Sequence, residues 1–157
     1  MDVALHFKVQ DLNARYVHAI DEDRLEEWPG FFAEDGRYRI TTAENVERGL
    51  PLSLMSATSR AMMRDRVNSL RNANVYESQR YRHAVGTPLI EGGNDGVVRA
   101  VTNFLVARIM HTGETTLFAT GRYEDRIAVA ADARPYFLEK TVILDSRQID
   151  TLLAIPL

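Results

Sequence analysis

The sequence contains no cysteine. This absence excludes disulfide bonds, ligation of an iron–sulfur cluster by thiolates of this chain, and thiolate nucleophiles. No apolar run approaches the length that a bilayer span requires, so we expect no membrane association. The opening ten residues have no sustained apolar stretch of the kind found in signal peptides, which predicts a cytoplasmic location.

Lysine is scarce as well. Of the 19 basic residues only Lys8 and Lys140 are lysines, so the other 17 are arginines. Two explanations stay open: a compositional bias of the genome, or a surface used for subunit contacts, where the planar guanidinium pairs well with carboxylates. The net charge of −3 gives no long-range attraction to nucleic acid, so we expect no such partner.

The remaining composition is that of an ordinary folded protein. The chain has 157 residues, of which 45% are hydrophobic and 26% charged. This size fits one hydrophobic core, and no linker, repeat or low-complexity segment interrupts it. We therefore expect a single domain over residues 1–157.

Helical spacing dominates the first part of the chain. Apolar residues predict a helix over 9–20 and a shorter one over 24–32 that ends near Pro29. Residues 36–42 alternate as a strand does, and residues 43–56 fit no clear element. Thr58 or Ser59 is a suitable N-cap for a further helix that runs to about Arg71. Its predicted buried side contains Met62, Val67 and Leu70.

The second half is predicted to be all strand. A strand opening at residues 80–83 runs to residue 90; Gly86 and Pro88 within it indicate an edge position or a bulge. Residues 92–96 form a strong hairpin signal, and a long strand follows over 97–111. The remaining elements are a turn at 112–113, a strand over 115–124 with its odd-numbered side chains buried, a loop over 130–135, a strand over 136–145 and an apolar tail over 150–157.

Helices followed by a long, curved antiparallel sheet make an α+β fold. A strongly bent sheet that wraps around helices forms a cone, and the mouth of a cone is a natural pocket. Tyr16, Trp28 and Tyr38 are candidates for lining such a cone, although aromatic residues at these spacings are more often core residues.

Several short motifs follow one another in a recognisable order. An acidic turn at 21–23 is followed by Trp28, a phenylalanine pair and an acidic residue within 31–36, a central helix around Arg66, and a strand that starts Arg80-Tyr81-Arg82-His83. Their order and spacing resemble the beta, or small, subunits of aromatic-ring-hydroxylating (Rieske) oxygenases over nearly the whole chain. One departure is Thr87, where that family often has asparagine.

This resemblance implies a cystatin-like cone, the fold also called nuclear transport factor 2-like or SnoaL-like, with N-terminal helices packed on the sheet. It implies a non-catalytic structural subunit that forms a trimer and joins three large (alpha) subunits in an alpha3beta3 hexamer. The large subunit would carry a Rieske 2Fe–2S cluster and a mononuclear iron. A ferredoxin or reductase would supply the electrons to that subunit, so it would be only an indirect partner of this chain. Residues 81–83 and 108–115 resemble the small subunits of terephthalate dioxygenases and salicylate hydroxylases, which implies hydroxylation of an aromatic carboxylate in aromatic catabolism.

The chain itself shows no pattern for these cofactors. It lacks the cysteine and histidine pairs of a Rieske centre, and no two of its four histidines have the spacing of a metal site. Surface or capping roles are expected for His6 and His18, and a solvated or interface role for His111. The carboxylates of Asp21, Glu22 and Asp23 are expected to cap the helix and face solvent.

We therefore expect Arg66, Arg80, Tyr81, Arg82 and His83 at a subunit interface, and no catalytic residue. Strand alternation places the two arginines of residues 80–83 on one face, where they could pair with carboxylates of another subunit. The alternative is a free-standing enzyme of the ketosteroid isomerase or dehydratase type, with His83 as a base in the cone. That alternative requires a buried acid–base pair and a ligand-sized hollow.

Overall fold

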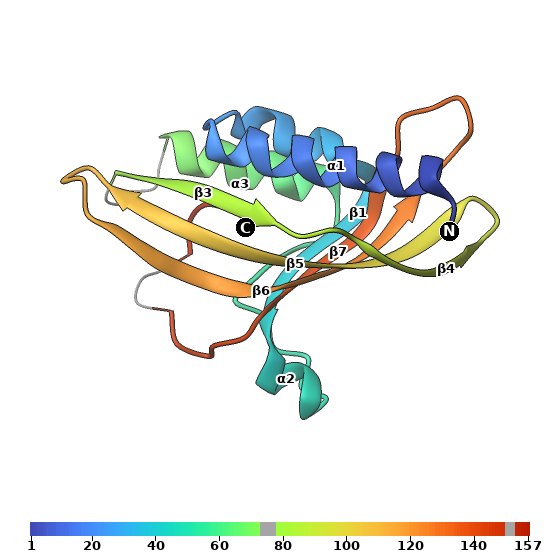
Figure 1. Ribbon diagram of the computed structural model, residues 1–157. Coiled ribbons are helices and arrows are strands. Elements are labelled where there is room, and N and C mark those ends of the chain that lie inside the picture. The colour runs from blue at the N-terminus through green and yellow to red at the C-terminus, as the bar shows by residue number, and fades with distance from the viewer. Residues whose placement is uncertain (73–77, 150–152) are drawn as a thin grey trace.

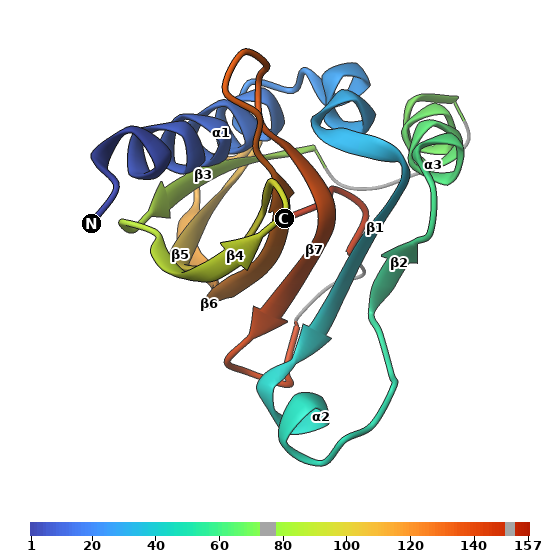
Figure 2. The same cartoon turned by 90° about the vertical axis from the view of Figure 1, so that its right-hand side faces the viewer.

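The computed structural model describes residues 1–72, 78–149 and 153–157, and places a helical layer on one side of a strongly curved sheet (Figures 1 and 2). α1 and α3 lie above the concave side, the long strands bend beneath them, and the short α2 lies away from them beyond the end of β1. The elements in chain order are α1 (Val3–Asp21), the 3-10 helix η1 (Leu25–Phe31), β1 (Phe32–Thr42), α2 (Ala43–Glu47), β2 (Met55–Ala57), α3 (Arg60–Asn72), β3 (Gln79–Val85), β4 (Leu89–Asn94), β5 (Val97–Met110), β6 (Thr115–Ala128) and β7 (Tyr136–Leu144).

The predicted α+β cone is confirmed, with one difference in strand direction. The sheet order is β2-β1-β7-β6-β5-β3, and β4 pairs with a separate part of β5. All neighbours are antiparallel except β1 and β7, which are parallel. These two strands lie far apart in the sequence, so no hairpin fixes their relative direction. The sheet is therefore mixed, where a wholly antiparallel sheet was expected.

Several predicted boundaries and faces need correction. The first helix begins at Val3, because the Asp2 carboxylate accepts a hydrogen bond from the Leu5 N–H at 3.0 Å and caps it. Met62 was predicted to be buried but is 45% exposed, while its neighbour Met63 is fully buried. Other corrections are that β1 begins at Phe32 and that residues 43–56 include α2 and most of β2. The predicted N-cap at Thr58 or Ser59 is confirmed, because the Ser59 hydroxyl accepts a hydrogen bond from the Met62 N–H at the start of α3.

The strand predicted to run to residue 90 is two strands. β3 ends at Val85 and β4 begins at Leu89, with Pro88 between them. Proline has no N–H to donate to a neighbouring strand, so the ladder breaks there. The hairpin that follows turns at Asp95 and Gly96, whose φ angles of 55° and 76° suit a tight two-residue turn.

A bulge reverses the inward face of β6. Ala119 pairs with Val106 and Leu117 with Ala107, so Phe118 has no partner in the register. Beyond the bulge Leu117 points outward and is 65% exposed, although the alternation predicted that it would be buried. In the middle of the strand, a Cβ on Gly121 would lie 2.1 Å from the Ile143 carbonyl oxygen, so only glycine fits.

Candidate functional site

Three consecutive carboxylates, at the end of α1 and just after it, contact two other elements of the fold, β3 and α3. Asp21 contacts His83 of β3, Glu22 pairs with Arg82 of the same strand, and the next carboxylate, of Asp23, pairs with Arg71 of α3. The sequence predicted caps and solvent-facing groups at these positions. Glu22 and Asp23 are indeed exposed, and Glu22 is the C-cap residue, but each also forms a tertiary ion pair.

The prediction for Asp21 was wrong, because this residue is only 5% exposed. Its Oδ1 lies 2.6 Å from Nδ1 of His83, and its Oδ2 accepts the backbone N–H of the same histidine at 2.8 Å. The His83 side chain is fully buried, and its Nε2 has no hydrogen-bond partner among the described residues. The pair therefore ties the end of the first helix to the middle of the edge strand.

The predicted alternation along β3 is confirmed. Arg80 and Arg82 are exposed, while Tyr81 and His83 are buried. The strand stands at one end of the sheet order, as expected for an edge. Arg82 reaches Glu22 at 3.1 Å, with side chains 54% and 46% exposed, so this pair is weak and open to solvent.

Tyr81 lies on the inner side with a second aromatic residue. Its ring stacks on Phe118 at 5.4 Å between centroids, and the guanidinium of Arg108 lies over the same Phe118 ring at 4.6 Å. The Tyr81 ring thus helps to hold β3 against the bulged part of β6. Arg66 lies half-buried on α3, and within the described parts of the chain no hydrogen bond or ion pair joins it to residues 80–83.

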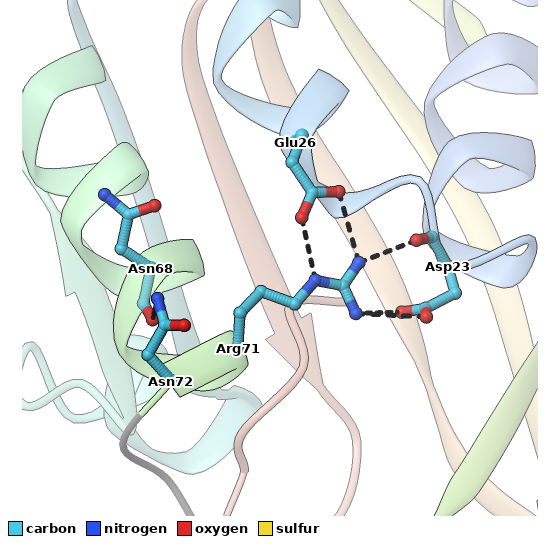
Figure 3. A network of polar contacts seen from close by, with 5 residues as sticks. All are labelled: Asp23, Glu26, Asn68, Arg71 and Asn72. Carbon is cyan, nitrogen blue, oxygen red and sulfur yellow. Dashed lines mark hydrogen bonds and ion pairs between the residues drawn. The ribbon is translucent and has the colours of Figure 1, made fainter.

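A residue that the sequence did not single out organises the region beside this strand. Arg71, at the end of α3, donates to the Asp23 carboxylate and backbone carbonyl and to both oxygens of Glu26 (Figure 3). Its guanidinium lowers the pKa of Glu26, and these carboxylates in turn raise the pKa of Arg71. One side chain therefore fastens α3 to the turn between α1 and η1.

The three predicted cone residues lie in a filled interior. Tyr16, Trp28 and Tyr38 are at most 1% exposed. The hydroxyl groups of both tyrosines donate to the carbonyl oxygen of Leu157 at 2.9 Å, and the indole N–H donates to the Tyr16 hydroxyl at 3.2 Å. Burial raises the pKa of both tyrosine hydroxyl groups well above the ordinary value for tyrosine. Part of the predicted apolar tail thus occupies the cone; residues 150–152 lie outside the described residues.

A buried ion pair, also missed from the sequence, lies deeper in the sheet. The Lys140 ammonium is 3.2 Å from the Asp125 carboxylate, and both side chains are fully buried. The ammonium also lies 3.7 Å from the centroid of Tyr123, 4.2 Å from that of Phe137 and 4.6 Å from that of Tyr16. Strand alternation could have indicated that Lys140 is buried, because it lies on the same face of β7 as Val142, which is fully buried.

Within the described parts of the chain, no group of three or more histidine and carboxylate side chains is placed to hold a metal ion. His18 and His111 are exposed, and His6 is partly exposed. No described helix is long and apolar enough to cross a membrane. The charge pairs described above join the end of α1 to the edge strand β3, and α3 to the turn and the 3-10 helix that follow α1.

Comparison with known proteins extends this picture. A family model described as the ring hydroxylating beta subunit matches residues 15–151. The terephthalate 1,2-dioxygenase terminal oxygenase component subunit beta 1 of Comamonas sp. is 42% identical over 150 residues, covering 96% of this chain and 97% of that protein. The anthranilate 1,2-dioxygenase small subunit of Burkholderia cepacia is 38% identical over 156 residues, covering 99% and 96%.

Solved structures agree. A protein of Novosphingobium aromaticivorans, described as the beta subunit of an aromatic-ring-hydroxylating dioxygenase, superposes with a TM-score of 0.89 at 35% identity, covering 98% of this chain and 97% of that one. A chain in a naphthalene 1,2-dioxygenase structure matches with a TM-score of 0.78 at 13% identity, covering 99% and 86%; this likeness concerns the fold alone.

Proposed function

This chain belongs to the ring-hydroxylating beta subunit family, and on that premise we propose that it is the structural subunit of a multi-component oxygenase that hydroxylates an aromatic carboxylate. The substrate class follows from the relatives, whose names specify terephthalate and anthranilate. These two relatives are named for different carboxylates, yet each is similar to this chain over nearly its whole length. This similarity supports a common role in assembly.

The observation that carries the structural role is the filled cone. Leu157 lies among the aromatic residues of the cone and bonds to Tyr16 and Tyr38, so the space in which a free-standing enzyme of this fold would hold its substrate is occupied. The charged contacts that surround it join structural elements to one another. This arrangement supports a rigid platform for another subunit.

We place the contact with other subunits on the β3 edge and the adjoining helix. Arg80 and Arg82 present exposed guanidinium groups there, and both are suited to carboxylates of a partner. Tyr81 and His83 would support this surface from the buried side, and Arg66 would extend it along α3. These five roles are a proposal that mutagenesis must test.

The assembly follows from the same premise. We propose that the chain forms a trimer and, with three large subunits, a hexamer, since closed rings satisfy repeated contacts. The large subunit would hold the Rieske cluster and the mononuclear iron, and would receive electrons from a ferredoxin or reductase. The cytoplasmic location stays a prediction that cell fractionation can test.

One observation favours the alternative function. Asp21 and His83 form a buried carboxylate–imidazole pair, and the outer nitrogen of the imidazole has no partner among the described residues. An isomerase or dehydratase would use such a pair as a general base. In this chain the histidine side chain is fully buried, which leaves no visible route for a substrate.

Light scattering and elemental analysis separate these functions. The purified chain should be a trimer with no stoichiometric iron or zinc, and the chain co-expressed with its large subunit should be a hexamer that contains the iron. A stable monomer that ignores the large subunit would overturn the proposed function. Isomerase activity of the chain alone, abolished by His83→Ala in a folded variant, would favour the alternative.

A further inference from the structure

An open groove lies on the other side of α1 from the β3 edge. Its walls are α1, η1 and the loop between β6 and β7, which rises beside α1 in Figure 2, and the start of α3 closes one end. Its volume is about 870 Å³. Its apolar lining includes Leu12, Phe31, Phe32 and Pro135.

The groove carries excess positive charge. Four arginines and two carboxylates line it, a balance of +2 with His18 neutral, on a chain whose net charge is −3. Arg15 pairs with Asp11 at 2.7 Å, four residues away, and Arg24 pairs with Glu27 at 2.8 Å, three residues away. The excess therefore resides in the two remaining arginines, Arg60 and Arg134.

These two arginines come from different elements. Arg60 opens α3 and donates to the backbone carbonyl of Phe32, a contact that positions the guanidinium without cancelling its charge. Arg134 lies in the exposed loop before β7, and the described residues offer it no carboxylate. An occupant with two or more carboxylates and an apolar side chain would satisfy both charges and cover the floor.

The openness of the groove decides what kind of occupant fits. Side chains on its rim remain half-exposed: Asp11 is 59%, Arg15 54% and Arg24 51% accessible. A small aromatic carboxylate is usually held in a pocket that buries about 70–90% of its surface, and these walls cannot enclose one to that degree. An extended polypeptide segment can lie along such a groove and contact both ends.

We infer that this groove docks an acidic segment of the large subunit, one that also inserts an apolar side chain against Phe31 and Pro135. The inference rests on the proposed function and adds a second contact surface to it, because no residue of β3 lines the groove. Complementary charge across an interface speeds association and fixes register, and it makes the contact sensitive to salt.

The test is a charge reversal in the loop. Arg134→Glu changes an exposed side chain, so the fold should persist, and Arg134→Lys retains the charge. The matched control is Arg99→Glu, which reverses the charge of an exposed arginine of β5 that does not line the groove. Each variant is co-expressed with the large subunit, and hexamer dissociation on dilution is followed by mass photometry at low and high salt.

Arg134→Glu should raise the protein concentration at which half of the hexamer dissociates by roughly tenfold or more, as is typical of a reversed interfacial charge. The same variant should make hexamer dissociation less dependent on salt. Arg134→Lys should restore most of the affinity, and Arg99→Glu should behave like the parent protein. If the parent hexamer forms and Arg134→Glu leaves its dissociation unchanged, the large subunit does not dock in the groove. The proposed function would still hold in that case. A parent chain that never forms the hexamer would overturn the proposed function itself.

Two other occupants would also contradict the inference, and each has its own readout. If a second copy of this chain fills the groove, Arg134→Glu should dissociate the trimer of the isolated protein. If a small aromatic carboxylate fills it, titration of the isolated trimer with terephthalate or benzoate should give saturable chemical-shift changes that Arg134→Glu abolishes. Neither effect is expected for a large-subunit segment.

Discussion

Asp21 and His83 are joined by two contacts, one through the imidazole at 2.6 Å and one through the backbone N–H at 2.8 Å. The carboxylate therefore fixes both the position of β3 and the orientation of the ring. Because both side chains are buried, neither can exchange its partner for water. This pair explains how an acidic helix end can serve as a structural anchor for an edge strand.

Replacing Asp21 should therefore destabilise the fold. Asp21→Ala leaves the His83 backbone N–H and the imidazole buried without an acceptor, which should cost about 2–4 kcal/mol. Urea denaturation measures the loss. Asp11→Ala is the control, because that carboxylate is 59% exposed and its one ion pair among the described residues is with Arg15, so its removal should cost under about 1 kcal/mol. Equal losses in both variants would contradict the anchor.

His83→Ala tests whether the same histidine has a chemical role. We expect lower stability or weaker assembly, with turnover per intact hexamer little changed once it is normalised to iron. The hexamer fraction from gel filtration is the sample to measure. A loss of about a hundredfold or more in turnover, with hexamer and iron intact, is the scale of a missing acid–base group and would show that the histidine takes part in chemistry.

Arg82→Ala separates interface from fold. Its pair with Glu22 is half-exposed, so the isolated chain should lose under about 1 kcal/mol. If Arg82 also meets a partner carboxylate that is partly desolvated, the hexamer should weaken by roughly 2–5 kcal/mol. Comparing Arg82→Ala with Glu22→Ala distinguishes the two, since the second variant frees the arginine for its partner. Equal effects of both variants on assembly would argue against the interface.

The buried pair of Lys140 and Asp125 predicts strong coupling. Burial lowers the pKa of the ammonium and raises the pKa of the carboxyl, and each charge opposes the effect on the other. Asp125→Leu alone should cost about 3–5 kcal/mol, because it leaves a buried charge unpaired. The double variant with Lys140→Met should cost clearly less than the sum of the single changes.

The adjacent residues on the same strands supply the control for that cycle. Arg126 and Glu139 lie 3.8 Å apart, and their side chains are 54% and 41% exposed. Their coupling energy should stay under about 1 kcal/mol. Similar coupling energies for the buried and the exposed pairs would show that burial does not govern the strength of the Lys140 contact.

Local patterns were sufficient for much of this fold and insufficient for its tertiary contacts. Periodicity and turn residues located the helices and most strands, because those signals act within a few residues. The outward turn of Leu117 depends on a bulge at Phe118, which shifts the alternation and leaves no mark of its own in the sequence. The burial of Asp21 depends on a strand that is 62 residues away.

In the candidate site, too, local features could be predicted from the sequence and tertiary contacts could not. The alternation that exposes Arg80 and Arg82 is a property of one strand and could be predicted. The partner of each charged residue could not be predicted, because the sequence of an acidic turn does not indicate which arginine will pair with it. Arg71 illustrates this: it ends a helix like any other basic residue, yet it contacts two carboxylates in a distant turn.

That contact makes a final prediction about pH. Arg71 lowers the pKa of Glu26 below its ordinary value of 4.5, so the unfolded chain binds this proton more readily than the folded chain. The stabilisation is therefore fully present above about pH 4.5 and is lost as the pH falls through the lowered pKa. Glu26 is 64% exposed, so its contribution should stay within the roughly 0.2–1 kcal/mol of exposed pairs.

The measurement is the difference in unfolding free energy between the parent chain and Glu26→Gln, taken from denaturant curves between about pH 3 and 7. The parent should be more stable at pH 7, and the two should converge toward the acid end. In an Arg71→Gln background the pH dependence of this difference should shrink, because the largest cause of the lowered pKa is gone and the backbone hydrogen bond of Glu26 remains. A pH dependence as large as in the parent background would mean that Arg71 is not the main cause, since no other ion pair of Glu26 exists among the described residues.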